Sequence, residues 1–185
     1  MRTNELIAKW LNQDETRVKA LQCARQLDLP QCYLAAGFVR NLVWDHLHGY
    51  SEATPLNDVD VVYFDPDEGD PNQYLVYERQ LTQMLPECQW QVRNQALMHL
   101  RNGDSPYRGT LDAMSYWPEK ETAVGVRLNS QGEFECIAAF GFESLFALQV
   151  TPNPKRPYSL FAERVCSKKW LEYWPKLVVN NQRPD

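Results

Sequence analysis

The stretch PLNDVDVVYFDP, Pro55 to Pro66, decides the fold of this chain, because it joins a β-strand pattern to two closely spaced acidic residues. Its run of valine and aromatic residues is typical of a central strand. Asp58 and Asp60 stand at alternate positions, and residues i and i+2 of a strand point to the same side. Two carboxylates on one face of a buried strand raise the free energy of the folded state unless a positive charge lies between them.

The pair of aspartates has two interpretations. A hard cation prefers carboxylate oxygens, and Mg²⁺ usually keeps positions free for water and substrate phosphates, so Asp58 and Asp60 are candidate ligands for Mg²⁺ or Mn²⁺. In the other interpretation both side chains are exposed at the N-terminal edge of the strand, where solvent screens their charges. The D-x-D pattern alone leaves both open.

A second stretch, LAAGFVRN, Leu34 to Asn41, predicts a strand that ends in small residues and a helix that begins just past Gly37. A glycine at such a junction lets phosphate oxygens approach the backbone, and the helix N-terminus offers free N–H groups to an anion. Arg40, one turn into the helix, can reach the same anion. The alternative is a tight turn that needs Gly37 only for packing.

The remaining sequence predicts an α+β fold with a mixed sheet that is covered by helices mainly on one side. Hydrophobic periodicity and turn residues place the elements as follows. We expect helices over 4–13, 14–29, 38–50, 73–85, within 105–117, over 143–150 and over 158–174, and strands over 32–35, 58–65, 88–99, 122–128 and 134–140. The segment 88–99 can also run from a strand into a helix.

The length of 185 residues suits one substantial core. We therefore expect a single domain over 1–185, with N-terminal helices over 1–30, a core over 31–154, and a C-terminal helix and tail over 155–185.

The composition limits the classes of partner and compartment. A formal net charge of −5 argues against bulk attraction to nucleic acid or to an anionic membrane, although local basic patches remain possible. No apolar run approaches the roughly 20 residues of a membrane span, and charges at Glu5 and Lys9 do not fit a signal peptide. Five cysteines without C-x-x-C spacing favour reduced thiols and a cytoplasmic protein.

Two motifs together resemble those of a known superfamily. Residues 36–41, AGFVRN, resemble the G-G-x-V-R-D element of the transfer-RNA nucleotidyltransferases, and Asp58-Val59-Asp60 resembles their downstream D-x-D. These enzymes belong to the DNA polymerase β nucleotidyltransferase superfamily. More broadly, the chain resembles a family of small bacterial nucleotidyltransferase-like proteins of undefined substrate. The segments that carry this resemblance are AAGFVRNLVWD, LNDVDVVYFD, WQVRNQALMH, DAMSYWPEKETAVGVRL and PNP, between Leu34 and Pro154.

The resemblance implies a reaction and a set of binding residues. A nucleoside triphosphate would bind with its phosphates on the loop and helix start formed by Ala36, Gly37, Arg40 and Asn41. One or two Mg²⁺ ions would bridge the phosphates to the two aspartates. A hydroxyl group of an acceptor, which could be RNA, protein or a small molecule, would attack the α-phosphate and release pyrophosphate. The protein could act as a monomer or a dimer.

The chain departs from the superfamily pattern at three points. Ala36 replaces a glycine, and Asn41 replaces an aspartate. A third carboxylate is expected on a neighbouring strand, yet the segment QWQVRNQ supplies Asn94 and no acid. Glu135 is the nearest acid on another predicted strand, and Asp112 is a further candidate. The candidate catalytic set is therefore Asp58, Asp60, Asn94 and Glu135.

Two functions from different classes remain open at this point. One is a Mg²⁺-dependent nucleotidyltransferase. The other is a non-catalytic nucleotide- or metal-binding module that kept the fold and lost the third acid. The basic pairs Lys155-Arg156 and Lys168-Lys169 could contact an acceptor, but such groups usually face solvent.

Overall fold

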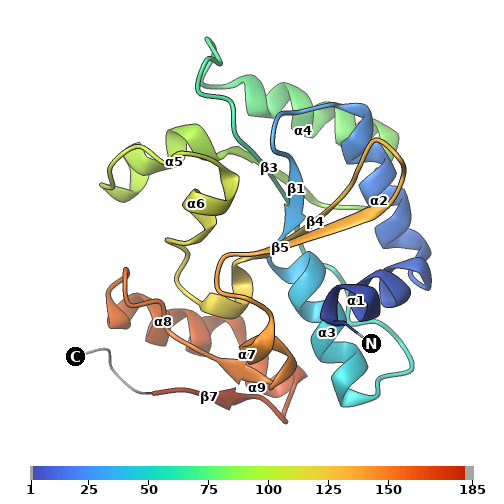
Figure 1. The fold of residues 1–185 in the computed structure, drawn as a ribbon, viewed down its shortest axis with the longest axis vertical. Helices are drawn as coiled ribbons and strands as arrows, with labels where there is room; N and C mark the ends of the chain where they lie inside the picture. The colour runs from blue at the N-terminus through green and yellow to red at the C-terminus, as the bar shows by residue number, and fades with distance from the viewer. Residues whose placement is uncertain (1, 182–185) are drawn as a thin grey trace.

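A five-stranded mixed β-sheet forms the centre of the computed structural model, which describes residues 2–181 (Figure 1). The strands follow the order β3-β2-β1-β4-β5. β2 and β3 are parallel, whereas the other neighbouring pairs are antiparallel. Their bounds are β1 Tyr33–Ala35, β2 Val59–Tyr63, β3 Trp90–Asn94, β4 Val124–Leu128 and β5 Phe134–Ala138. The expected α+β fold with a mixed sheet is confirmed.

The alternation of side chains along β2 divides the sheet into two faces. Val59, Val61 and Tyr63 are fully buried beneath helices, whereas Asp60 and Val62 point to the other face. Ala35 of β1 and Gln91 of β3 are the register partners of Asp60. The strand that carries Asp60 is therefore central, with a neighbour on each side.

Four helices cover one face of the sheet and build the main core with it. They are α1 Thr3–Asn12, α2 Glu15–Gln26, α3 Gly37–His48 and α4 Gln73–Met84. Arg17 of α2 is 1% exposed, and its Nε donates a hydrogen bond of 2.8 Å to the carbonyl oxygen of Phe38. This bond fixes the first turn of α3 against α2, so the helix that follows Gly37 has a defined position.

Fewer and shorter helices cover the opposite face of the sheet. Helices α5 Gln95–Asn102 and α6 Thr110–Met114 lie on the other side of the sheet from α1 and α2 (Figure 1). A small cluster made by Ala35, Val62, Met114 and Ala123 is buried there. The expectation that 88–99 runs from a strand into a helix is met by β3 and α5. Part of this face stays open beside β2.

The C-terminal region differs from the single long helix expected over 158–174. The structure has α8 Tyr158–Lys168 and α9 Trp170–Tyr173, and the break falls at Lys169, whose φ is 55°. The break turns Trp170 and Trp174 inward, 3% and 2% exposed, where both rings contact the ring of buried Trp44. Burial of two indoles stabilises the bent path more than one further helical turn would.

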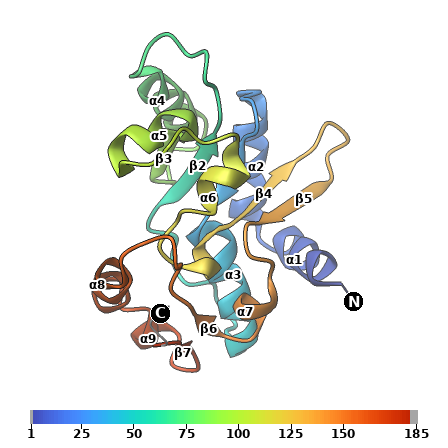
Figure 2. The same cartoon turned by 60° about the vertical axis from the view of Figure 1, so that its left-hand side comes forward.

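The region before α8 also differs from the sequence prediction. A helix was expected over 143–150, but α7 covers only Glu143–Phe146, and β6 Gln149–Val150 follows it. β6 pairs in parallel with β7 Val178–Val179. A short 3-10 helix, η1 Lys120–Thr122, precedes β4. Figure 2 shows α8 and α9 at the end of the molecule opposite α4. Within residues 2–181, no helix is long and apolar enough to cross a bilayer.

The turn between β1 and α3 holds a strained residue. Ala36 has φ 57° and ψ −125°, a conformation that glycine adopts freely and alanine does not. Its N–H donates to the carbonyl oxygen of Val124, and its own carbonyl oxygen accepts from the backbone N–H groups of Val39 and Arg40. The surrounding hydrogen bonds therefore hold Ala36 in place at a cost in conformational energy.

We expect Trp174→Phe to lower the free energy of unfolding by about 1.5–3 kcal/mol, the range for a hydrogen bond to a charged group. The indole Nε1 donates a bond of 2.8 Å to the carboxylate of Asp45, which is 4% exposed and would lose this donor. Urea denaturation measures the change. Tyr173→Phe, at a side chain that is 49% exposed, is the control and should stay within about 0.5 kcal/mol of wild type. Equal effects in the two variants would contradict this account.

We expect Ala36→Gly to raise the free energy of unfolding by about 1 kcal/mol, because relief of backbone strain exceeds the entropy that glycine adds to the unfolded chain. Thermal and urea denaturation give the difference. Ala35→Gly, one residue earlier at a fully buried strand position, should lower stability by about 1 kcal/mol instead. A lower free energy of unfolding in Ala36→Gly would contradict the conclusion that the backbone of Ala36 is strained.

Candidate active site

The two aspartates at the start of β2 line one cleft. Asp58 directly precedes the strand and is exposed, whereas Asp60 is its second residue and is half-buried. The cleft has a first lobe of about 230 Å³ and a second lobe of about 370 Å³. Both lobes are lined by Ala36, Asp58, Asp60, Thr122, Arg164 and Lys168. The structure thus brings together the two candidate metal ligands and the turn at Ala36.

The surroundings of Asp60 disfavour its charged form. Burial raises the pKa of Asp60 above its ordinary value, and the charge of Asp58 raises it further. The cations Arg40, Lys168 and Arg93 partly oppose this rise in pKa. The interpretation in which solvent screens both charges fits Asp58, which is exposed, but not Asp60, which is half-buried. A divalent cation between the two carboxylates would relieve the unfavourable energy.

The first lobe contains the start of α3. Ala36 occupies the N-cap position, and within residues 2–181 no side chain caps this helix end. The backbone N–H groups of Gly37 and Phe38, which precede the bonded N–H groups of Val39 and Arg40, are therefore available to an anion. A Cβ atom added to Gly37 would lie 3.2 Å from Nη2 of Arg40 and 3.3 Å from Nδ2 of Asn41. Gly37 thus leaves the space in which these two polar side chains lie beside the helix end.

Arg40 is the most constrained charge of the site. It is 8% exposed, and its guanidinium lies 5.2 Å from the ring centre of Trp44 and 4.7 Å from that of Trp170. Nη1 donates to the hydroxyl of Thr122 over 2.7 Å, and Nε donates to Oδ1 of Asn41 over 3.2 Å. None of its hydrogen bonds within residues 2–181 uses Nη2. Burial lowers the pKa of Arg40 to about 10, so the group stays charged at neutral pH.

Asn94 is not brought to the aspartates. Gln91 and Arg93 of β3 line the second lobe, and the alternation of the strand turns Asn94 to the other face. Asn94 is 3% exposed and caps α5: its Oδ1 accepts from the backbone N–H groups of Asp65 and Ala96. An asparagine directly before a helix is a common N-cap, and this signal was present in the sequence.

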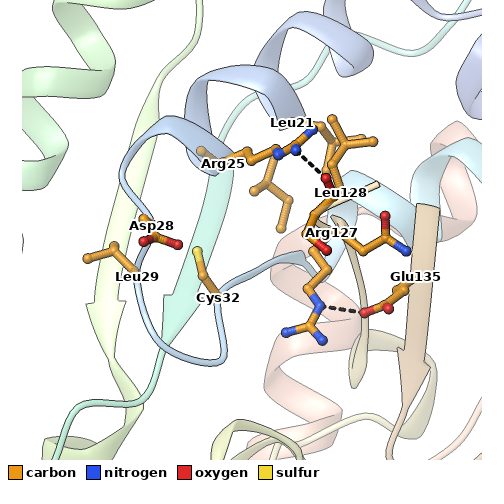
Figure 3. A pocket seen from close by; sticks show the side chains of 12 residues that line it. Leu21, Arg25, Asp28, Leu29, Cys32, Arg127, Leu128 and Glu135 are labelled. Carbon is orange, nitrogen blue, oxygen red and sulfur yellow. Dashed lines mark hydrogen bonds and ion pairs between the residues drawn. The ribbon is translucent and has the colours of Figure 1, made fainter. Parts of the chain in front are cut away.

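Glu135 also lies away from the aspartates. β1 and β4 separate its strand from β2, which corresponds to about 14 Å at the usual strand spacing. Oε2 of Glu135 accepts from Nε of Arg127 over 2.6 Å, and this hydrogen bond holds the pKa of Glu135 below its ordinary value. The pair lines a different pocket of about 290 Å³, beside Arg25 and Cys32 (Figure 3).

No third carboxylate joins the pair within the described part of the chain. Asp58 and Asp60 are the acids that line either lobe, and residues 2–181 hold no group of three or more His, Cys, Asp or Glu side chains that could bind a metal ion. Asp112, in α6, accepts a hydrogen bond from the backbone N–H of Arg108 and lines neither lobe. A cation here would take its further ligands from water and from a substrate.

The sequence did not identify the residues that hold the cations of the site in place. Glu119, fully buried, accepts hydrogen bonds from Nε and Nη2 of Arg164 in α8. Thr122, three residues later, holds Arg40. The segment PEKET, which carries both residues, lies in one of the stretches that resemble the nucleotidyltransferase-like family. A pairing across 45 residues leaves no periodic signal in the sequence.

The chain is similar to several solved structures. A protein solved by NMR and described as a CCA-adding enzyme head domain is 33% identical, with a TM-score of 0.86 and 98% of each chain covered. A CCA-adding enzyme in complex with CTP is 13% identical, with a TM-score of 0.54; 97% of this chain matches 44% of that one. A tRNA-processing enzyme in an apo form is 16% identical, with a TM-score of 0.53, and 93% of this chain matches 45% of it. The last two likenesses, at such low identity, concern the fold alone.

Family and curated sequences give the second comparison. No curated protein matches the chain. The family model described as nucleotidyltransferase matches residues 22–179, which include both lobes of the cleft and the helix α8. With most of its length matched, this chain belongs to that nucleotidyltransferase family.

Proposed function

We propose that the protein is a Mg²⁺-dependent nucleotidyltransferase, which moves a nucleoside monophosphate from a nucleoside triphosphate to a hydroxyl acceptor. One observation carries the proposal: Asp58 and Asp60 share a cleft with the uncapped start of α3 and with Arg40. Membership of the family and the likeness to a CCA-adding enzyme head domain agree with nucleotidyl transfer in general.

The donor chemistry of the cleft fits a hard divalent cation. Asp58 and Asp60 would hold Mg²⁺, or Mn²⁺ in its place, through carboxylate oxygens. The bound ion would neutralise charge on the phosphates and orient them for displacement. The residues of the chain would contribute alignment and charge, which supply most of the catalysis in phosphoryl transfer.

The two lobes would separate the leaving group from the acceptor. The triphosphate would lie in the first lobe, where the backbone N–H of Gly37, Nη2 of Arg40 and the amide of Asn41 can bind its oxygens. In-line displacement requires the acceptor to approach the α-phosphate from the opposite side, which is the second lobe. That lobe offers Gln91, Arg93, Gln95, Arg101 and Trp117 to an acceptor of RNA, protein or small-molecule type.

The second candidate is a non-catalytic nucleotide- or metal-binding module. The observation in its favour is that neither lobe has a third carboxylate within the described residues to take the proton of the acceptor hydroxyl. Single-turnover assays with nucleotides labelled at the α-phosphate separate the two functions. Transfer of label at a rate that rises with pH supports the enzyme, since hydroxide would replace the missing base. Binding without transfer supports the module.

The proposed compartment is the cytoplasm. The five cysteines Cys23, Cys32, Cys88, Cys136 and Cys166 are all free, which fits a reducing environment. Burial raises the pKa of Cys32 and of Cys136 to about 12, so both stay protonated thiols at neutral pH.

We expect the double variant Asp58→Asn with Asp60→Asn to lose Mg²⁺ and Mn²⁺ binding in isothermal titration calorimetry. Its stability without metal should stay level or rise, because the repulsion between the two carboxylates is removed. Asp67→Asn, at an exposed aspartate beyond the other end of β2, is the matched control and should bind as wild type does. Metal binding that survives in the double variant would rule this site out.

We expect Gly37→Ala to weaken nucleotide binding about tenfold, which corresponds to about 1.4 kcal/mol. The new methyl group would displace Arg40 and Asn41 from their places beside the helix end. Fluorescence or calorimetric titration with a nucleoside triphosphate measures the change. Gly69→Ala, where an added Cβ atom meets nothing within 4 Å, should leave the affinity unchanged. Unchanged affinity in Gly37→Ala as well would remove the helix start from the binding site.

A further inference from the structure

We infer that Lys168, supported by Arg164, binds the phosphate groups of the nucleotide from helix α8, on the side of the cleft opposite the aspartates. This inference rests on the proposed function and adds a phosphate-binding element that neither the turn at Gly37 nor the D-x-D motif contains. Lys168 and Arg164 are i and i+4 neighbours on α8, and both line both lobes of the cleft. They therefore lie where the two lobes meet.

Cationic side chains outnumber acidic side chains along the cleft. Five cationic side chains line the two lobes, against the two acids Asp58 and Asp60: they are Arg40, Arg93, Arg101, Arg164 and Lys168. The whole chain has a formal net charge of −5, so the cleft is more positive than the chain as a whole. A concentration of positive charge in a cleft attracts an anion, and a triphosphate is the anion that the proposed reaction uses.

Lys168 is the cation of α8 that remains available. Within residues 2–181 no carboxylate oxygen lies within 4.0 Å of its Nζ, whereas Arg164 is paired with buried Glu119. Lys168 lines both lobes together with Asp58 and Asp60, so it faces the same cleft as the acidic pair. Arg164, oriented through Nε and Nη2, supports the same side of the cleft.

Two buried anchors fix the position of this part of α8. Glu119 holds Arg164. At the end of the helix, the turn at Lys169 directs Trp170 into the core, where its ring lies 4.7 Å from the guanidinium of Arg40. Lys168 thus stands two residues before an indole that packs on another cation of the first lobe. A lysine placed on such a support loses less entropy on binding than one at the end of a free helix.

The chemistry of the leaving group agrees with this position. Negative charge grows on the leaving pyrophosphate during transfer, and a cation already in place stabilises it without reorganisation. Lys168 would therefore contact the β- or γ-phosphate rather than the nucleobase or the sugar. Binding of the phosphates alone should depend on Lys168, whichever nucleotide the protein prefers.

Calorimetric titration with inorganic tripolyphosphate in the presence of Mg²⁺ tests the inference on the full chain. Lys168→Ala should weaken binding at least tenfold, and Lys168→Arg should retain most of the affinity. Lys169→Asn is the matched control: it removes the adjacent charge at a position where asparagine tolerates the left-handed backbone, and it should bind as wild type does. Circular dichroism and thermal melting check that the variants are folded.

The outcomes separate this inference from the proposed function. Unchanged affinity in Lys168→Ala, an equal loss in Lys169→Asn, or no binding of tripolyphosphate by wild type would overturn the role of Lys168. If wild type binds tripolyphosphate through Lys168 but transfers no labelled nucleotide, the inference stands and the enzymatic function fails. If transfer proceeds and Lys168→Ala changes neither the affinity nor the rate, the inference alone fails.

Discussion

The buried guanidinium of Arg40 is the charge on which the candidate site depends. Removing such a group from water is costly, and the structure offsets the cost with the hydroxyl of Thr122 and the faces of two indoles. These partners come from α3, from the segment before β4 and from α9. Because loss of one partner would leave the buried charge with less compensation, three distant parts of the chain are held together at the first lobe.

Local patterns explain what the sequence predicted well. The alternation of a β-strand predicted Asp58 and Asp60 on one side, and in the structure both line the same cleft. The small residues before Gly37 placed the junction of β1 and α3. Both features follow from the backbone geometry of a few neighbouring residues, which the sequence displays directly. The turn needs a positive φ at Ala36, which explains why related motifs have glycine at that position.

Long-range contacts explain what the sequence did not predict. Periodicity alone extends the C-terminal helix to Trp174, but contacts with Trp44 and Asp45, about 130 residues earlier, bend the chain at Lys169. Asn94 was assigned to the site because it lies on a neighbouring strand, and the alternation of that strand, with the need to cap α5, turns it away. Glu135 lies on a strand of the same sheet, but the strand order separates it from Asp60.

The fold therefore distributes the charges of the cleft over two kinds of element. Asp60 stands on the central strand β2, whose register with β1 and β3 fixes it, and Asp58 directly precedes that strand. The cations Arg164 and Lys168 stand on α8. Because these opposite charges stand on a strand and on an anchored helix, both would remain available to the proposed metal ion and phosphate. The proposed transfer would depend on alignment and charge. For that chemistry the lack of a third acid among the described residues would weaken proton transfer more than binding.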